Sequence, residues 1–295
     1  MEKDIKVSSN HLSLKLKFKG YVDLLKLRLS FLVVVSALLG YFIAPEETNH
    51  FVVFCLLIGG FLITGASNAL NQVWERDLDK LMSRTQNRPI PKGILSVRES
   101  LFFAALCFLV GIFLLWNINL SCAILGFLAL VSYVLIYTPL KTVSPIAVLV
   151  GAFPGSIPPM LGYIAASGGF GLEAGILFIV QFFWQFPHFW SIAWNLDNDY
   201  RKAGFKMLPS GFRDKKSAFQ IMLYTGFLIP VSMLPWVVNM CGSISMVLSI
   251  IFGCIILIPA FLLHQSLDMK YAKQVMFYSF AYIPLLLLVY FLDKI

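Results

Sequence analysis

Long apolar stretches separated by short polar ones run along almost the whole chain. A helix that crosses the hydrocarbon core of a bilayer needs about 20 mostly apolar residues. Stretches of this length are too continuously apolar to be the alternating strands of a membrane barrel. The pattern predicts an all-α fold, a polytopic membrane bundle of nine transmembrane helices. The nine spans are expected at approximately 22–44, 51–74, 99–117, 119–138, 143–165, 172–194, 217–239, 243–264 and 272–292.

The composition agrees with this fold class. Of the 295 residues, 59% are hydrophobic and only 13% are charged, values outside the range of ordinary soluble domains. We expect residues 1–20 to form a cytoplasmic N-terminal tail and residues 21–295 a single membrane domain. The tail has Glu2 and Asp4 among its lysines and no arginine, which is unlike a mitochondrial transit peptide, and the first span is too long for a cleaved signal. These features favour a bacterial-type plasma-membrane protein.

The basic residues predict the orientation. If the N-terminus is cytoplasmic, 22 of the 23 lysines and arginines fall in cytoplasmic segments, as the positive-inside rule requires. The C-terminus is then outside. The net charge of +8 is therefore a topology signal, and it does not indicate nucleic-acid binding. The five cysteines are scattered through apolar spans without a CxxC pair or metal-ligand spacing, so we expect packed thiols and no disulfide framework.

A first polar cluster, "NQVWERDLDKLMSRTQNRPIPKG", follows the second expected span at residues 71–93. Asn71, Glu75 and Asp79 are four residues apart and therefore share one helix face. Asp77 lies on roughly the opposite face. Prolines then end the helix, and the segment around them carries the bases Arg84, Arg88 and Lys92.

A second cluster, "WNLDNDYRKAGFKMLP", follows the sixth expected span. Asn195 lies 120 residues after Glu75, Asp199 lies 120 after Asp79, and Pro209 lies 120 after Pro89, which suggests an internal duplication. Four spans separate the clusters, so both face the same side and can meet across one cavity. Oxygen ligands without His or Cys suit a hard cation such as Mg²⁺, and nearby bases suit a polyanion. We interpret the pair as a metal-diphosphate site; the alternative is interfacial anchors and solvated loop residues.

The first cluster resembles the signature of the UbiA superfamily of intramembrane prenyltransferases, which are nine-helix bundles. The match is N-x-x-x-E-x-x-x-D followed by R-T-x-N-R-P, and it covers Asn71, Glu75, Asp79, Arg84, Thr85, Asn87, Arg88 and Pro89. Within that superfamily, "GAFPGSIPPMLGY" at 151–163, "WQFPHFW" at 184–190 and "DYRKAGFKMLP" at 199–209 look like the branch that farnesylates protohaem IX.

The resemblance implies that farnesyl diphosphate alkylates a vinyl group of protohaem IX (haem b), giving haem O once water has added. By the same implication Glu75, Asp79, Asn195 and Asp199 hold Mg²⁺. The diphosphate is bound by Asn71, Arg84, Arg88 and Lys141. Glu75, Asp79, Asp199 and Lys141 are the implied catalytic residues. Many relatives carry an acid at the position of Asn195. This leaves open whether the second metal site is fully charged or whether Asp197 takes the place of Asn195 as a metal ligand. A downstream membrane protein that modifies haem or assembles an oxidase is the implied recipient of the product.

Four further features have a functional and a structural interpretation. Aromatic rings can shelter an allylic cation or simply pack, and the candidates are Tyr133, Tyr137, Trp184 and Phe186. Lys141 is a diphosphate ligand or an interfacial anchor. The Gly- and Pro-rich stretch 151–163 predicts a broken helix that borders a cavity, with close helix packing as the alternative. His188, inside a span, is a candidate haem-iron ligand or a hydrogen-bonded structural histidine.

Two other functions fit parts of the pattern. A transporter also combines repeats with broken helices, but here the acids lie at cytoplasmic helix ends beside basic loops rather than at the bilayer midplane. A prenyltransferase acting on an aromatic quinone precursor shares the diphosphate site, and the segment "WQFPHFW" at 184–190 argues against it.

Overall fold

The structure is a computed structural model that describes residues 2–295, with side chains from residue 14 onward. Over this range the chain is helical, and its one β-bridge joins Cys241 to Lys294. The helices are α1 (Glu2–Leu25), α2 (Leu27–Ile43), α3 (His50–Trp74), α4 (Arg76–Asp79), α5 (Val97–Trp116), α6 (Leu120–Val131), the π-helix η1 (Ser132–Tyr137), α7 (Thr138–Val143), α8 (Ala147–Ser167), α9 (Leu172–Lys202), α10 (Lys215–Ser232), α11 (Leu234–Val237), α12 (Ser243–Ser266) and α13 (Met269–Leu292).

The predicted membrane bundle is confirmed, with one difference in the number of spans. Within the described residues, eight helical segments are long and apolar enough to cross a membrane, and α6, η1 and α7 together make one of them. The first expected span, 22–44, corresponds to α2, which has only 17 residues and is not among the eight. Its length is at the lower limit of about 17 residues for a spanning helix. The shortening arises because the helix begins at Leu27, after a break at Lys26.

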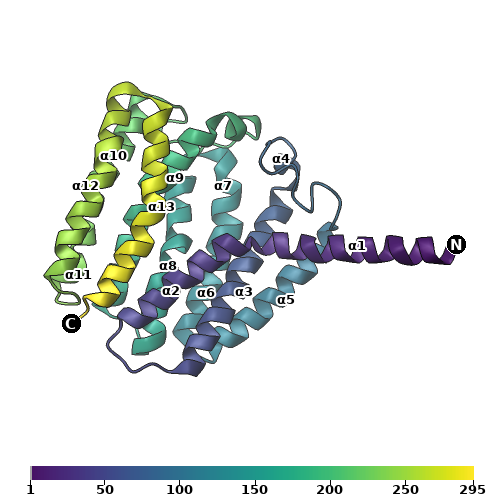
Figure 1. The fold of residues 1–295 in the computed structure, drawn as a ribbon, viewed down its shortest axis with the longest axis horizontal. Helices are drawn as coiled ribbons and strands as arrows, with labels where there is room; N and C mark the ends of the chain where they lie inside the picture. Colours follow the sequence, from purple (N-terminus) through teal and green to yellow (C-terminus); the bar gives the residue numbers. More distant parts are fainter. Residues whose placement is uncertain (1) are drawn as a thin grey trace.

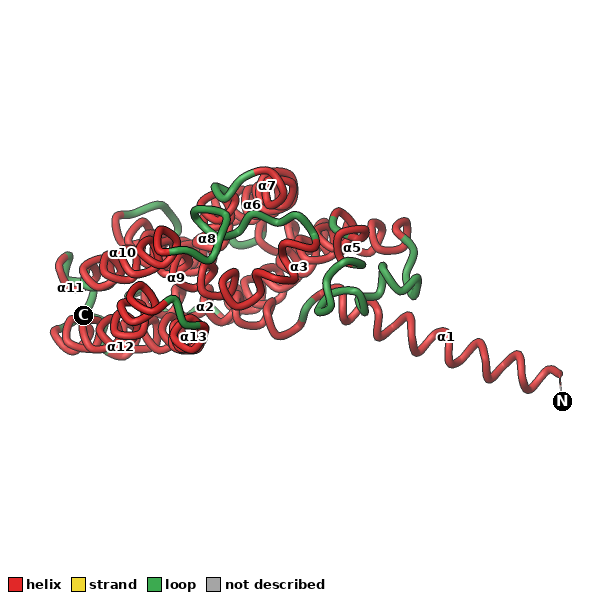
Figure 2. Tube along the Cα trace, turned by 90° about the horizontal axis from the view of Figure 1, so that it is seen from above, coloured by secondary structure: helices red, strands yellow, loops and turns green. Residues whose placement is uncertain are grey.

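The break at Lys26 separates α1 from the bundle. Lys26 adopts a left-handed backbone conformation with φ 48° and ψ 60°, which a lysine rarely adopts. The segment expected to be an N-terminal tail is part of α1, and α1 projects sideways from the bundle toward the N-terminus (Figure 1; Figure 2). Gln72 of α3 donates a 2.9 Å hydrogen bond to the Leu24 carbonyl and ties the end of α1 to the bundle.

The two polar clusters lie at the same end of the bundle. The end of α3 with α4, the end of α7 and the end of α9 are together at the top of Figure 1, and the C-terminus is at the opposite end. At that opposite end Lys294 donates to the carbonyls of Phe42 and Ala44, at 2.8 and 3.0 Å, and so closes the end of α2. Lys294 is the one basic residue that the predicted topology places outside, and it is held by these two backbone carbonyls.

The prediction of a broken helix over 151–163 is wrong, because α8 is continuous through Pro154, Pro158 and Pro159. Its glycines instead allow close packing. A Cβ at Gly162 would lie 1.8 Å from the Ala37 carbonyl oxygen of α2, and one at Gly40 of α2 would lie 2.0 Å from the Pro159 oxygen. Small residues let membrane helices approach backbone to backbone. The alternative interpretation, close helix packing, is the one that the structure supports. The five cysteines are free thiols, as expected, and all but Cys254 are buried.

Candidate active site

A polar cavity of about 360 Å³ lies at the end of α3. It combines acids, bases and aromatic rings from six segments of the chain. Its lining consists of Lys26, Leu29, Asn71, Glu75, Asp79, Met82, Arg84, Thr85, Arg88, Tyr133, Tyr137, Lys141, Tyr200, Phe205 and Met207. Six of the residues predicted from the sequence are therefore brought together, namely Asn71, Glu75, Asp79, Arg84, Arg88 and Lys141.

Asn71, Glu75 and Asp79, called here the acidic stripe, still share one face although the helix is interrupted. Glu75 is the residue between α3 and α4, with φ −86° and ψ 4°. The helical hydrogen bonds nevertheless continue across it, from Glu75 N to Asn71 O at 2.9 Å and from Asp79 N to Glu75 O at 2.8 Å. Asp77 points away and pairs with Lys80 at 2.8 Å on the exposed side. The four-residue spacing thus predicted both the stripe and the exclusion of Asp77.

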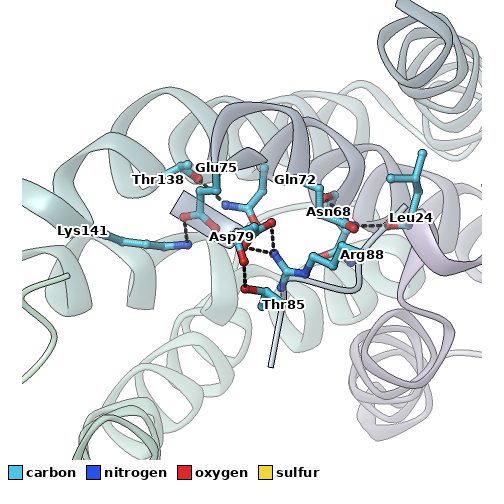
Figure 3. Close-up of polar contacts among 10 residues, drawn as sticks. Leu24, Asn68, Gln72, Glu75, Asp79, Thr85, Arg88, Thr138 and Lys141 are labelled. Carbon is cyan, nitrogen blue, oxygen red and sulfur yellow. Dashed lines mark hydrogen bonds and ion pairs between the residues drawn. The ribbon is translucent and has the colours of Figure 1, made fainter. Parts of the chain in front are cut away.

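Each carboxylate of the cavity is paired with a cation. Lys141 donates to Glu75 at 2.7 Å, and one guanidinium nitrogen of Arg88 contacts both oxygens of Asp79, at 2.7 and 2.6 Å. Lys141 and Arg88 approach from opposite sides (Figure 3). Glu75 and Asp79 are 4% and 0% exposed, so the pairs are almost removed from water. Burial raises the pKa of the Asp79 carboxyl, and the Arg88 charge opposes that shift.

Lys141 is buried within the cavity, which excludes its interpretation as an interfacial anchor. Its ammonium lies 4.5 Å from the ring centroid of Tyr137 and 5.9 Å from that of Tyr133. Both tyrosines come from η1, and their rings are 5.2 Å apart. The Lys141 carbonyl accepts a 2.7 Å hydrogen bond from the Lys206 amide, which attaches the segment after α9 to the same site. Two of the four candidate aromatic residues therefore lie beside the charges.

Two hydroxyl contacts fix the ends of the stripe. The Asn71 amide donates to the Thr138 hydroxyl at 3.2 Å, and the Thr85 hydroxyl donates to the Asp79 carbonyl at 3.0 Å. The first contact holds α3 against the start of α7. The second holds the loop that carries Arg84 and Arg88 against α4.

Lys26 is a cavity residue that the sequence analysis did not identify. It lies at the break between α1 and α2, and over the described residues no acid pairs with it. Loss of hydration, together with the charges of Arg88 and Lys141, lowers the pKa of its ammonium to about 7. The available signal was a lysine inside "VDLLKLRLSF", a position that we took to lie within the first span. Lys26 and Arg84 give the cavity two cations beyond those already paired.

The end of α9 also contributes residues that the sequence did not single out. Tyr200, Phe205 and Met207 line the cavity. All three lie in the second cluster, and the resemblance to a known motif there was the only signal for them. The two clusters therefore meet at one cavity, although the second cluster contributes residues other than Asn195 and Asp199.

The expected metal ligands of the second cluster do not line the cavity. Asp199 instead accepts a 2.6 Å hydrogen bond from Ser83 of the loop after α4, and Asn195 donates to the Ser191 carbonyl at 2.8 Å. Asp197 pairs with Arg201 at 3.0 Å and with Arg213 at 3.6 Å, so it does not substitute for them. Among the residues from 14 onward, no group of three His, Cys, Asp or Glu side chains is arranged to hold a metal ion.

The remaining candidates lie outside the cavity lining. His188 is buried between α9 and α13, where its Nδ1 is 2.9 Å from the Ser279 hydroxyl. Trp184 stacks on the His188 ring with a centroid distance of 4.5 Å. Phe186 packs against Tyr224 of α10 at 4.7 Å. His188 and Trp184 therefore pack together apart from the polar cavity, and Phe186 packs between α9 and α10.

A family model described as "UbiA prenyltransferase family" matches residues 33–281. A protoheme IX farnesyltransferase of Christiangramia forsetii is 47% identical over 279 residues, 93% of this chain and 93% of its own. A protoheme IX farnesyltransferase of Flavobacterium psychrophilum is 46% identical over 94% of this chain and 95% of its own.

Solved structures share the fold at low sequence identity. A digeranylgeranylglyceryl phosphate synthase structure matches with a TM-score of 0.79 and 19% identity, covering 94% of this chain and 98% of its own. A UbiA homolog from Archaeoglobus fulgidus bound to GPP and Mg²⁺ matches with a TM-score of 0.67 and 17% identity, covering 90% of this chain and 99% of its own.

Proposed function

The chain belongs to the UbiA prenyltransferase family, and we propose that it transfers the farnesyl group of farnesyl diphosphate to a vinyl group of protohaem IX. The relatives named protoheme IX farnesyltransferase support this substrate pair, since they are 46–47% identical over nearly the whole chain. The helices place the protein in the membrane, where an isoprenoid chain and a porphyrin both dissolve. The charge distribution supports an active site on the cytoplasmic side.

The observation that carries the proposal is the charge balance of the cavity. Lys26, Arg84, Arg88 and Lys141 face only two carboxylates, Glu75 and Asp79. Arg84 therefore remains unbalanced in a partly enclosed site, and Lys26, whose pKa is lowered to about 7, adds a second positive charge when it is protonated. Such a site attracts a polyanion. A diphosphate fits that charge, and the rings of Tyr133 and Tyr137 beside it fit the apolar allylic end that follows.

The donor set of the cavity fits Mg²⁺, which proteins usually bind through one or two carboxylates while substrate phosphates and waters complete the shell. Glu75 and Asp79 are the proposed ligands, because they are adjacent and offer only oxygen. Bound there, Mg²⁺ would supply neutralisation of the charge that grows on the leaving diphosphate. Asp199, held by Ser83 at 2.6 Å, joins this set only when Ser83 releases it, and Asn195 is the weaker candidate because it lies deeper on α9.

The chain's own cations stabilise the departing diphosphate. When the allylic C–O bond breaks, its electron pair stays on the diphosphate oxygen, and Lys141, Arg88 and Arg84 are placed to bind the charge that develops. Electrostatic stabilisation of this kind is usually the largest single contribution to catalysis. Lys141 and Arg88 are already held at the site by their bonds to Glu75 and Asp79. They therefore need little reorganisation when the substrate binds.

The tyrosines of η1 stabilise the allylic cation that forms when the diphosphate leaves. An allylic cation next to the faces of Tyr133 and Tyr137 is stabilised by their π electrons and is kept from premature attack by water. The vinyl group of protohaem then attacks the allylic carbon. Water adds to the resulting haem-side cation and loses one proton, which leaves a hydroxyethylfarnesyl substituent. The product is haem O.

On the haem side we propose His188 as the iron ligand, because it is an ionisable residue within a membrane helix. Its position between α9 and α13 keeps it away from the diphosphate residues. The experiment that tests the whole assignment is mass spectrometry of haem extracted from cells with and without this gene, in a host that lacks its own enzyme. A farnesylated haem that depends on the gene is expected. Unchanged haem together with a prenylated quinone precursor would transfer the assignment to the other substrate class.

A further inference from the structure

Ser279 of α13 makes two hydrogen-bond contacts, one to a backbone carbonyl of its own helix and one to the ring of His188. Its hydroxyl donates to the Met276 carbonyl at 2.7 Å, and a serine hydroxyl has only one hydrogen to donate. The same oxygen lies 2.9 Å from His188 Nδ1. With the hydroxyl hydrogen directed at the Met276 carbonyl, this oxygen accepts from Nδ1, and Nδ1 then carries the proton. Ser279 is 0% exposed, and water does not compete for this contact.

In this tautomer the other ring nitrogen of His188, Nε2, is unprotonated. A neutral imidazole protonated at Nδ1 has its lone pair on Nε2, and in the part of the chain with described side chains no hydrogen bond reaches Nε2. The ring is bordered by aromatic groups instead. Trp184 stacks on it at 4.5 Å and an interplanar angle of 19°, and Phe280 meets it edge-on at 4.8 Å. The Trp184 indole donates to the Ser279 carbonyl at 2.8 Å and so fixes the stacking partner to the same residue.

We infer that Ser279 is a positioning residue that holds His188 as the Nδ1–H tautomer with Nε2 free to bind the iron of the haem substrate. This inference rests on the proposed function, because it names how that site receives its porphyrin. A metal-binding histidine commonly donates its other ring N–H to a fixed acceptor, which sets the tautomer, orients the ring and strengthens the ligand. Here the acceptor comes from a different helix, so the site is assembled only when α9 and α13 are packed together.

A second unpaired acceptor lies on the same side of α9. Asn195 is seven residues after His188, two helical turns along, and its amide nitrogen is 3.8 Å from the Met276 sulfur of α13. Its amide oxygen Oδ1 is buried and has no hydrogen-bond partner among the described side chains. A buried acceptor without a donor is costly in a folded protein. It leaves an acceptor open to a polar group or a water between α9 and α13, on the helix face that His188 also occupies.

The tautomer can be measured without any substrate. Protein with ¹⁵N-labelled histidine contains four histidines, and His188→Gln assigns the signals of His188. The nitrogen chemical shifts of the wild-type protein are expected to show Nδ1–H and an unprotonated Nε2. A wild-type His188 protonated at Nε2 would overturn the inference, whatever the fate of the variants.

The haem titration tests the consequence. Ser279→Ala is expected to weaken haem affinity about 10-fold or more and to shift the haem absorption spectrum, while farnesyl diphosphate affinity stays unchanged. Ser279→Thr, which keeps a hydroxyl, is expected to restore the spectrum. Ser249→Ala on α12 is the matched control, because it removes a fully buried serine hydroxyl that contacts backbone carbonyls, those of Ser245 on α12 and Ser232 on α10.

The outcomes separate this inference from the proposed function. Equal haem affinity and spectrum in Ser279→Ala, Ser249→Ala and wild type would overturn the positioning role while leaving farnesyl transfer intact. Failure of the wild-type protein to bind haem at all would overturn the proposed function and this inference with it. If Ser279→Ala does not fold, the tautomer of the wild-type protein still decides the question.

Discussion

Lys141 donates a 2.7 Å hydrogen bond to the carboxylate of Glu75, although the two residues lie 66 positions apart in the chain. The contact joins the end of α3 to α7 inside a cavity where neither side chain reaches bulk water. Taking two charges out of water costs several kcal/mol per ion, and their attraction only partly offsets that cost. In the proposed function, the pair has a role beyond stability, because it preorganises a cation for an anionic substrate.

The buried pair predicts a characteristic pattern of stabilities. Lys141→Met leaves the Glu75 carboxylate buried without a partner and is expected to lower the free energy of unfolding by about 3–5 kcal/mol. The double variant Glu75→Gln with Lys141→Met is expected to recover much of that loss. Thermal unfolding of the detergent-purified proteins measures both. Lys80→Met, which removes an exposed pair with Asp77, is the control and is expected to cost no more than about 1 kcal/mol. Equal stability of the single and double variants would contradict the account.

The metal site predicts different effects for two neighbouring aspartates. Asp79→Asn is expected to reduce turnover about 100-fold or more, since metal-assisted charge stabilisation contributes several kcal/mol and each 1.36 kcal/mol is tenfold in rate. Asp77→Asn, two residues away but on the exposed face, is expected to keep near wild-type turnover. Steady-state kinetics with and without a chelator measures this. Full activity in excess chelator, or in Asp79→Asn at saturating Mg²⁺, would be inconsistent with the proposed site.

Lys26 predicts a change in substrate affinity. It has no acidic partner in the described structure, and its pKa is lowered to about 7 by burial and by the neighbouring cations. A diphosphate beside it favours the charged ammonium and gains a further ligand. Lys26→Met is expected to raise the dissociation constant of farnesyl diphosphate about 10-fold or more, because a hydrogen bond to a charged group contributes about 1.5–3 kcal/mol. Direct titration of the ligand measures it. Lys19→Met, on the exposed surface of α1, is the control, and an equal effect of the two substitutions would remove Lys26 from the site.

The distribution of basic residues predicts the topology. Cysteines introduced at Gly169 and at Ser210 are expected to react with membrane-impermeant reagents from opposite sides, Gly169 from outside and Ser210 from the cytoplasm. The measurement is labelling of intact cells compared with inverted vesicles. The native protein is the background control. Labelling of both positions from one side would refute the orientation.

The sequence predicted the fold and half of the site for physical reasons that can be named. Span length and helical periodicity are local, so the bundle and the shared face of Asn71, Glu75 and Asp79 could be read directly. Contacts between distant segments are not local. The pairing of Lys141 with Glu75 depends on how α7 packs on α3, and the sequence therefore offered Lys141 only as a diphosphate ligand or an anchor.

The differences between the sequence predictions and the structure also have physical causes. Glycines and prolines in 151–163 suit a broken helix and a tightly packed one equally well, and only the approach of α2 to α8 at Gly162 distinguishes them. Lys26 was assigned to a span because the chain around it is apolar, and the left-handed backbone that places it in the cavity has no signal in a lysine. Asn195 and Asp199 have the right spacing for ligands, but α9 turns them toward α13 and toward Ser83 instead.

The most direct test of the central claim is a reaction of the purified protein in detergent with farnesyl diphosphate, protohaem IX and Mg²⁺, followed by mass spectrometry of the porphyrin. The account predicts a new haem whose mass has increased by one farnesyl group and one hydroxyl group. It also predicts that Asp77→Asn forms the product at about the wild-type rate and that Asp79→Asn forms it at least about 100-fold more slowly. An unmodified haem in the presence of folded wild-type protein and both substrates would contradict it.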